Sequence, residues 1–265
     1  MKYALTVQYI GKNYSGSQLQ PDKPSIQEEL EKALCTLIIK KCKSGINNSN
    51  IVEPEYTLNN RQIKAVFSGR TDKGVNSIGQ VVHFEVDEPI VASRFMYSLN
   101  EILPDDISVS DLKEVDASFH AQKSARRRHY EYVFVNRKCK NAFDGNLMRI
   151  KYDIDITRMQ KALDYIKGEH DFSSFKTSGT QNPSKVCIIY EATAKKVGDK
   201  VFINIVGNRF LYNMVRAIVG TLLEIEGHNL HFSHMKDVLD AKDRRKAGRT
   251  VSPYGLTLMR VDYSQ

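Results

Sequence analysis

The chain has 265 residues, of which 41% are hydrophobic and 26% charged, so it can bury a core and does not have the composition of a disordered chain. It carries 39 basic and 31 acidic side chains, a formal net charge of +8, which favours a polyanionic partner. No apolar stretch approaches the roughly 18 residues of a membrane span, and the start MKYALTVQYIGKNY lacks the apolar run of a secretory signal. We therefore predict a cytoplasmic protein with no membrane partner.

Strands and helices alternate in the first half of the chain. Residues 3–9 alternate in polarity and predict a strand. Ser25 and Glu28 form a capping-box pattern, and apolar residues then recur at helical spacing over 26–38. The Asn-rich stretch 43–61 predicts an exposed loop or a pair of short strands. The other elements expected in this half are strands at 63–68, 80–86 and 107–115, a polar loop at 69–79 and a helix at 91–100.

The second half has a similar order of elements without a sequence repeat. We predict strands at 129–135, 185–197, 200–206 and 255–263, and helices at 157–167, at 209–225 and after Ser233. This mixture predicts an α+β fold of two α/β halves, 1–118 and 119–265. We expect their antiparallel sheets to join into one central sheet, with helices on one side and an active-site cleft between the halves.

The loop GRTDKGV contains the first candidate for chemistry. Gly69 and Gly74 flank Arg70 and Asp72, and glycines permit a sharp turn and close approach of the backbone to a ligand. An aspartate presented between two strands can act at a cleft where arginines hold it. The alternative is a solvated hairpin tip with ordinary charges.

An arginine interrupts the apolar helix predicted at 209–225. Apolar residues cover most of the circumference of this helix, yet Arg216 lies in its middle. A buried arginine requires an acidic partner and hydrogen bonds, and Asp72 is a candidate. In the alternative interpretation, Arg216 reaches solvent from the edge of the helix.

Three basic residues precede an aromatic strand, which begins HYEYVFV. Arginines beside aromatic rings can hold phosphates and stack on unpaired bases. The alternative is a core of Tyr130 and Tyr132 with exposed charges around it. We predict an RNA-binding role for the run Arg126, Arg127 and Arg128.

The sequence gives no support for a metal-dependent or nucleotide-dependent enzyme. The sequence contains no GxxxxGK[ST], GxGxxG or HExxH motif and no C-x-x-C pair. His228, His231 and His234 are three residues apart, but no acidic ligand accompanies them. We predict no metal, no nucleotide cofactor and no other cofactor.

The string SGRTDKGVNSIGQVVHFEV resembles the signature of the tRNA pseudouridine synthase A family. The resemblance continues in order through most of the chain: YIGKNYSGSQLQ precedes this string, and ARRRHYEYVFVN, GEHDFSSFKTSG, GNRFLYNMVRAIVG and AGRTVSPYGLTLMRVDY follow it. It implies the pseudouridine synthase fold, a homodimer, and a cofactor-free isomerase. The implied substrate is tRNA, modified at uridines of the anticodon stem-loop (family positions 38–40).

The resemblance also implies a role for individual residues. The essential aspartate of the family falls on Asp72, and its active-site arginine falls on Arg70. Tyr130 takes the position of the tyrosine that stacks on the target base. Arg216 takes the position of the arginine that pairs with the aspartate, and Leu256 that of the leucine lining the uracil pocket.

Departures from the family pattern leave several alternatives open. Asn76 stands where the family often has His, Ser17 replaces a frequent aromatic residue, and the stretch 43–61 is longer than usual. The RNA target can therefore differ, or the chain can be a noncatalytic RNA-binding module. A metal-dependent nuclease would need clustered carboxylates, which the sequence does not show. Asp72 could act as a nucleophile at the ribose or remove a ribose proton, and the sequence leaves both open.

Overall fold

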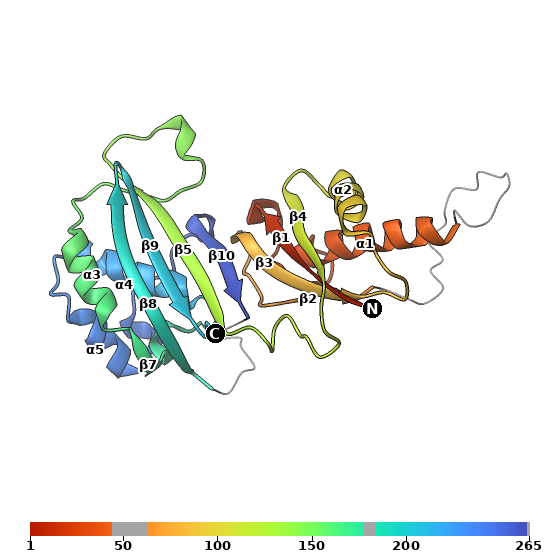
Figure 1. Ribbon diagram of the computed structural model, residues 1–265. Coiled ribbons are helices and arrows are strands. Elements are labelled where there is room, and N and C mark those ends of the chain that lie inside the picture. Colours follow the sequence, from red (N-terminus) through yellow and green to blue (C-terminus); the bar gives the residue numbers. More distant parts are fainter. Residues whose placement is uncertain (44–62, 178–183, 264–265) are drawn as a thin grey trace.

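A ten-stranded mixed sheet forms the centre of the molecule (Figure 1). The computed structural model describes residues 1–43, 63–177 and 184–263, so nearly all of the stretch 43–61 lies outside the described residues. The main strand order is β4-β1-β3-β10-β5-β9-β8-β7, with β2 beside β3 and β6 beside β5. The strands are β1 (Lys2–Tyr9), β2 (Val66–Phe67), β3 (Asn76–Glu85), β4 (Ile107–Glu114), β5 (Arg127–Asn136), β6 (Arg149–Ile150), β7 (Gly168–Asp171), β8 (Val186–Val197), β9 (Lys200–Gly207) and β10 (Leu256–Asp262). The helices are α1 (Ile26–Lys43), α2 (Ala92–Ile102), α3 (Ile156–Asp164), α4 (Met214–Gly227) and α5 (His234–Ala241).

The last strand joins the two halves. β10 runs antiparallel to β5, its neighbour from the C-terminal half, and parallel to β3 from the N-terminal half. The parallel pairs are Thr257 with Asn76 and Leu258 with Ser77. The predicted joining of two sheets into one is thereby confirmed. The predicted division at 118/119 falls in the connection between β4 and β5, and it stays a prediction.

One face of this continuous sheet can be followed from half to half through its paired residues. Tyr9 pairs with Ser77, Ser77 with Leu258, and Leu258 with Tyr130. Tyr130 in turn pairs with Ile205 of β9. Because directly paired residues point to the same side of a sheet, these five side chains share one face.

Both hydrophobic cores lie on that face. In the N-terminal half, Leu5 and Val82 pack with Leu30 of α1 and Leu99 of α2. In the C-terminal half, apolar residues of β5 and β9 pack against α3, α4 and α5 in the same way; examples are Tyr132, Ile203, Met159, Ile218 and Met235. Helices therefore cover one side of the sheet, as the sequence predicts. No helix in the described ranges is long and apolar enough to cross a membrane.

Several predicted elements differ in extent from the structure. The helix predicted at 209–225 begins only at Met214, because Asn213 has a φ of 62°, in the left-handed region that a right-handed helix cannot include. The strand predicted at 63–68 shortens to Val66–Phe67. Conversely, β3 starts at Asn76 rather than residue 80, because its first residues pair with β10.

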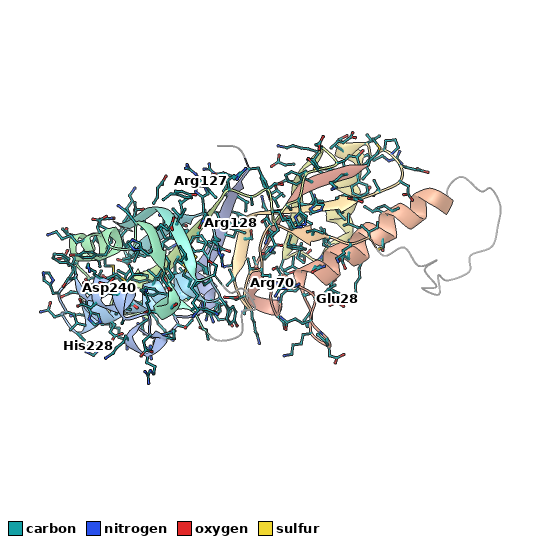
Figure 2. All side chains as sticks on the ribbon, turned by 90° about the horizontal axis from the view of Figure 1, so that it is seen from below. Glu28, Arg70, Arg127, Arg128, His228 and Asp240 are labelled. Atoms are coloured by element: carbon teal, nitrogen blue, oxygen red, sulfur yellow. The ribbon has the colours of Figure 1, made fainter. Side chains whose placement is uncertain are left out.

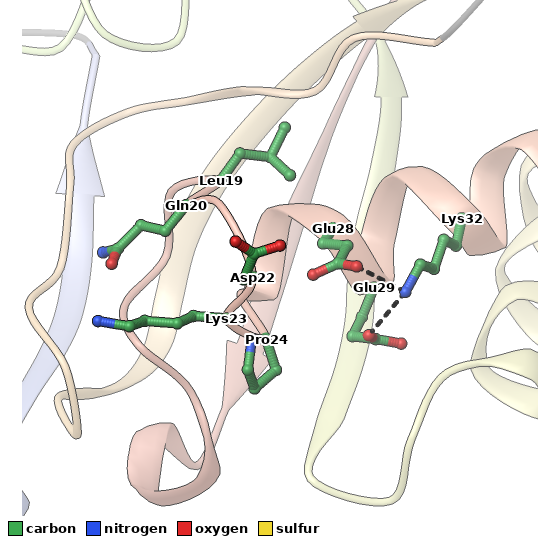
Figure 3. A pocket seen from close by; sticks show the side chains of 8 residues that line it. All are labelled: Leu19, Gln20, Asp22, Lys23, Pro24, Glu28, Glu29 and Lys32. Carbon is green, nitrogen blue, oxygen red and sulfur yellow. Dashed lines mark hydrogen bonds and ion pairs between the residues drawn. The ribbon is translucent and has the colours of Figure 1, made fainter.

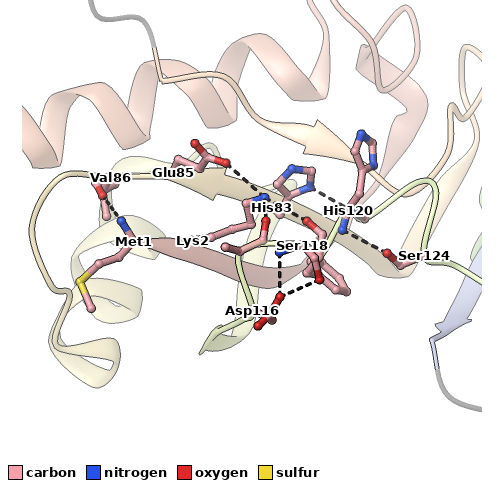
Figure 4. A network of polar contacts seen from close by, with 12 residues as sticks. Met1, Lys2, His83, Glu85, Val86, Asp116, Ser118, His120 and Ser124 are labelled. Atoms are coloured by element: carbon pink, nitrogen blue, oxygen red, sulfur yellow. Dashed lines mark hydrogen bonds and ion pairs between the residues drawn. The ribbon is translucent and has the colours of Figure 1, made fainter.

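The connection between β4 and β5 is bound to the N-terminal half (Figure 4). The Lys2 ammonium group donates to the carbonyl oxygens of Ala117 and Phe119 at 2.6 and 3.1 Å. The backbone N–H of Ala121 donates to Nδ1 of His83 at 3.1 Å. Most of the His83 side chain is buried in this contact, which indicates a structural histidine.

Arg128 ties this connection to both halves. Its guanidinium donates to four carbonyl oxygens, those of Ala125 (3.1 Å), Asn208 (2.6 Å), Ser68 (3.1 Å) and Gln122 (3.0 Å). Ser68 directly precedes the GRTD loop, whereas Asn208 follows β9. Arg128 thus has a structural role that its basic run does not reveal.

We expect Arg128→Lys to destabilise the fold by about 3 kcal/mol, because an ammonium group cannot span four separated acceptors and leaves some of them unpaired. Urea unfolding followed by circular dichroism measures the change. Arg126→Lys in the same run is the control, because Arg126 is exposed and its replacement should change stability by less than about 0.5 kcal/mol. Equal stability of both variants would contradict the structural role of Arg128.

Candidate active site

Asp72 lies in a tight turn between β2 and β3. The backbone N–H of Val75 donates to the Asp72 carbonyl oxygen at 3.1 Å and closes the turn. Gly74 has a φ of +80°, a backbone conformation that side chains disfavour. A Cβ at Gly74 would lie 2.9 Å from Cγ of Pro253. The glycine is therefore needed both for the turn and for the close approach of the loop before β10.

The residue before Asp72 is held on three sides. The Thr71 backbone N–H donates to Oγ of Ser17 at 2.8 Å, and the Ser17 N–H donates to the Thr71 carbonyl oxygen at 3.1 Å. The Thr71 hydroxyl shares a 2.8 Å hydrogen bond with the buried hydroxyl of Tyr9. Burial raises the pKa of Tyr9 to about 12, so its phenol remains protonated and available for this contact.

Gln80 fixes the start of the same loop. Its side-chain amide donates to the Gly69 carbonyl oxygen at 2.9 Å, while its carbonyl oxygen accepts a hydrogen bond from the Ser68 hydroxyl. Gln80 and Ser68 are both fully buried. Backbone and side-chain contacts thus position the Asp72 loop before any ligand is bound, which favours a functional site.

The N-terminus of α4 faces this loop. Arg216 donates through Nε to the Val251 carbonyl oxygen at 2.8 Å and through Nη1 to Oδ1 of Asn213 at 2.6 Å. Asn213 also donates through Nδ2 to Oγ1 of Thr177 at 3.2 Å. These bonds orient the guanidinium, so the arginine that interrupts the apolar helix is buried with partners.

The predicted pairing of Arg216 with Asp72 is present as a close approach. Nη1 of Arg216 lies 3.8 Å from Oδ2 of Asp72, and the two side chains are 15% and 21% exposed. At this distance the contact is electrostatic rather than a hydrogen bond. The interpretation in which Arg216 reaches solvent does not hold.

Burial dominates the electrostatics of Asp72. Loss of solvation raises the pKa of its carboxyl group, and the charge of Arg216 and the backbone N–H of Asn213 offset only part of this rise. Asn213 directly precedes α4, so the carboxylate also lies near the positive end of the helix dipole. The result is a partly dehydrated carboxylate with a cation beside it, an arrangement that is typical of catalytic acids and bases.

Tyr130 and Leu256 lie on the same face of the sheet as this pair. The ring of Tyr130 packs edge-on against Phe210, with 5.1 Å between ring centroids. Burial raises the pKa of Tyr130, and the negative charge of Asp72 raises it further. Leu256 is 5% exposed and pairs with Tyr132, two residues along the strand from Tyr130. Tyr130 therefore lies close enough to Asp72 to feel its charge, and the roles of Tyr130 and Leu256 toward the base stay predictions.

Other predicted residues lie outside this cluster. Arg70 is exposed and makes no hydrogen bond or ion pair within the described part of the chain, and Figure 2 shows it near the junction of the halves. Arg126 and Arg127 are exposed, and Arg127 lies over the Tyr190 ring at 4.7 Å. Their RNA-binding role, like that of Arg70 in the active site, stays a prediction.

A surface hollow at the start of α1 contains none of these residues (Figure 3). It is lined mostly by charged and polar side chains, with Leu19 and Pro24 among them, and Lys32 within it pairs with Glu28 at 2.8 Å. These charges neutralise one another on an open surface, so we assign no chemistry to the hollow. Nor do three or more His, Cys, Asp or Glu side chains come together as a metal site anywhere in the ranges that the structure describes.

Sequence reasoning missed several residues that hold the site. Tyr9, Ser17 and Gln80 contact the loop from elements distant in the chain, and no local pattern marks them. The residue type of Asn213 was one possible signal, because Asn adopts the left-handed backbone conformation more readily than most residues, and Asn213 has that conformation here.

We expect Gly74→Ala to destabilise the protein by about 1–3 kcal/mol and to lower turnover, because the new methyl group is strained at φ +80° and contacts Pro253. Gly69→Ala is a matched control in the same loop, since a Cβ there meets nothing within 4 Å. Thermal unfolding and turnover are measured on both variants. A Gly74 variant as active and stable as the Gly69 variant would show that the turn does not constrain Asp72.

Comparison with known proteins identifies similar sequences over nearly the whole chain. A family described as tRNA pseudouridine synthase matches residues 162–264. The tRNA pseudouridine synthase A of Thermoanaerobacter sp. (strain X514) is 38% identical over 260 residues, 98% of each chain. That of Bacillus subtilis is 38% identical over 264 residues, 99% of each chain. A crystal structure of a Cbf5-Nop10-Gar1 complex matches with 11% identity over 84% of this chain and 54% of that one; its TM-score is 0.34, too low to add to the assignment. Full-length identity at this level shows that the chain belongs to the tRNA pseudouridine synthase A family.

Proposed function

We propose that this protein isomerises uridine to pseudouridine in the anticodon stem-loop of tRNA, with Asp72 as the essential catalytic residue. Pseudouridine synthesis in tRNA is the activity for which its relatives are named. The observation that carries the proposal is the mostly buried carboxylate of Asp72, which a hydrogen-bonded loop holds with its Oδ2 3.8 Å from Nη1 of Arg216. We further expect a cytoplasmic protein that forms a homodimer. Sedimentation of the purified protein tests the dimer.

The reaction needs no co-reactant, which suits this site. The bond from C1′ of the ribose to N1 of uracil breaks, the base turns, and C1′ bonds to C5, which then loses its proton. Asp72 would either attack C1′ or remove a ribose proton so that a glycal forms. Both routes require an ionised carboxylate, and Arg216 favours the ionised form by its charge.

The target base must leave its stack before it can reach Asp72. Base flipping costs a few kcal/mol, and stacking on an aromatic ring returns about 1–3 kcal/mol. Tyr130 lies on the active-site face of the sheet, with its ring held by Phe210. We assign it to this stacking role, with Leu256 lining the uracil pocket.

The pKa of Tyr130 bears on the final proton transfer. Because burial raises this pKa above its ordinary value near 10, the phenol is protonated at neutral pH. A protonated phenol cannot accept the C5 proton without first losing its own. The raised pKa makes the phenolate harder to form, which favours stacking over general-base chemistry for Tyr130.

Tritium release tests the activity. Purified protein is incubated with unmodified tRNA transcripts that carry tritium at C5 of uracil, in the presence of EDTA, and the tritium released to water is counted. Carbodiimide adducts and reverse-transcription stops then map the modified uridines. Release with stops in the anticodon stem-loop is the expected result. Binding without release from any tRNA would favour a noncatalytic RNA-binding module, and stops elsewhere would assign another RNA target.

A further inference from the structure

The most exposed large apolar side chain of the described residues lies far from Asp72. Phe143 is 97% exposed, on the loop that connects β5 to β6 (Figure 1). Its neighbours Asn141, Ala142, Gly145 and Asn146 are polar or small and are themselves exposed. A phenyl ring that stays in water contributes none of the stabilisation that burial of a Phe side chain gives. Its exposure therefore indicates a function rather than a role in stability.

The loop that presents this ring is fixed. Asn141 and Asp144 form a capping box around the short 3-10 helix Ala142–Asp144, and the Phe143 N–H donates to Oδ1 of Asn141 at 3.0 Å. The Arg137 guanidinium pairs with Asp144 and, at 2.8 Å, with Oδ2 of Asp199 on the turn between β8 and β9. The ring is thus presented by a hydrogen-bonded platform.

Several lysines lie on the segments that form and adjoin this platform. Asp144 and Asp199, the acidic groups that hold the loop, are both paired with Arg137. By contrast, the loop carries the exposed lysines Lys138 and Lys140, and the strand ends beside the β8–β9 turn carry the exposed lysines Lys196 and Lys200. The Lys196 ammonium group donates at 2.7 Å to Oδ1 of Asn136, the last residue of β5 before the loop. The surface therefore combines one flat aromatic face with a positive field.

We propose that Phe143 stacks on an unpaired base of the RNA substrate while the surrounding lysines contact its phosphates, so that this loop is a second RNA-binding site. A single ring among cations fits one base and its phosphates. A protein partner would need a larger apolar patch, which the polar neighbours of Phe143 do not provide.

The site is separate from the base that reacts. Tyr130 and Asn136 are six residues apart on β5, about 20 Å at the rise of a strand, and the loop continues beyond Asn136. The base at Phe143 is therefore a different nucleotide from the one at Asp72. The inference deepens the proposed function, because it takes the RNA substrate from it, but its test does not depend on turnover.

Tryptophan fluorescence provides that test, because the chain contains no tryptophan. In Phe143→Trp the single indole occupies the loop, and a stacked base should quench it as an unmodified tRNA transcript is added. Tyr97→Trp is the matched control, since Tyr97 is 69% exposed on α2 in the other half. Inorganic polyphosphate, which offers phosphates without bases, is titrated in parallel. We expect saturable quenching only for Phe143→Trp and only with RNA.

Substitutions then separate stacking from other roles. Phe143→Ala should weaken tRNA binding about tenfold and raise KM while leaving kcat within about twofold. Phe143→Leu should behave like Phe143→Ala, whereas Phe143→Tyr should bind as the natural chain does. Full affinity in Phe143→Leu would indicate simple apolar docking and would overturn stacking.

Three further results would also overturn the inference: quenching of both tryptophan variants alike, quenching by polyphosphate, or a change in sedimentation without a change in RNA binding. Absence of tritium release from the natural chain would refute the proposed isomerase activity but leave the fluorescence result to decide the role of Phe143. Loss of quenching with normal release would refute the loop site alone.

Discussion

Asp72→Asn is expected to reduce turnover by at least about a thousandfold while tRNA binding stays within a few-fold of the natural chain. Asparagine keeps the shape of the side chain but can neither attack C1′ nor accept a ribose proton. Single-turnover tritium release measures the first effect, and filter binding measures the second. Asp22→Asn is the control, because Asp22 is exposed and its φ of 57° is one that asparagine tolerates.

The same variant distinguishes loss of chemistry from loss of fold. Burial raises the pKa of Asp72, so the ionised carboxylate opposes folding at neutral pH, and this penalty disappears as pH falls below the pKa of the unfolded chain. Asp72→Asn should therefore be no less stable than the natural chain at neutral pH, and any advantage should shrink in acid. An inactive variant that also unfolds easily would leave the catalytic role unsupported, and a variant with retained turnover would refute it.

Arg216→Gln is expected to lower kcat/KM at neutral pH on the order of a hundredfold, comparable to removal of one charge-stabilising group from an active site. The charge of Arg216 lowers the pKa of Asp72 against the effect of burial. Without the charge of Arg216 the pKa of Asp72 rises, so the acid limb of the pH–rate profile should move to higher pH. Activity requires the ionised carboxylate of Asp72, and at a given pH the variant has a smaller fraction of it.

Arg216→Lys is the matched control for charge. It keeps a cation near Asp72 but cannot reproduce both the bond to the Val251 carbonyl and the bond to Asn213. We expect its acid limb to stay close to that of the natural chain, although both variants should lose about 1–3 kcal/mol of stability through the unpaired acceptors. Identical pH profiles for Arg216→Gln and the natural chain would show that Arg216 does not tune Asp72.

The tertiary structure revised the interpretation of the basic run at the start of β5. Sequence patterning treats Arg126, Arg127 and Arg128 alike, as neighbours with one charge each. In the fold, Arg128 turns inward to four carbonyl oxygens, whereas Arg126 and Arg127 remain exposed. The partners of Arg128 come from segments up to 80 residues away, so no local rule could have separated it from its neighbours.

The sequence by itself determined the α+β class and most of the elements, and it required an acidic partner for the arginine in the apolar helix, with Asp72 as a candidate. These inferences rest on the periodicity of apolar residues and on the rule that a buried charge needs a partner. Both can be applied to a short segment of sequence without knowledge of the fold.

Only the tertiary structure decided that β10 joins the halves in parallel with β3, that α4 starts after a left-handed Asn213, and that Phe143 stands free on a rigid loop. Strand order, a single unusual backbone angle and the exposure of one ring depend on contacts between residues distant in the chain. Such contacts do not exist until the chain has folded.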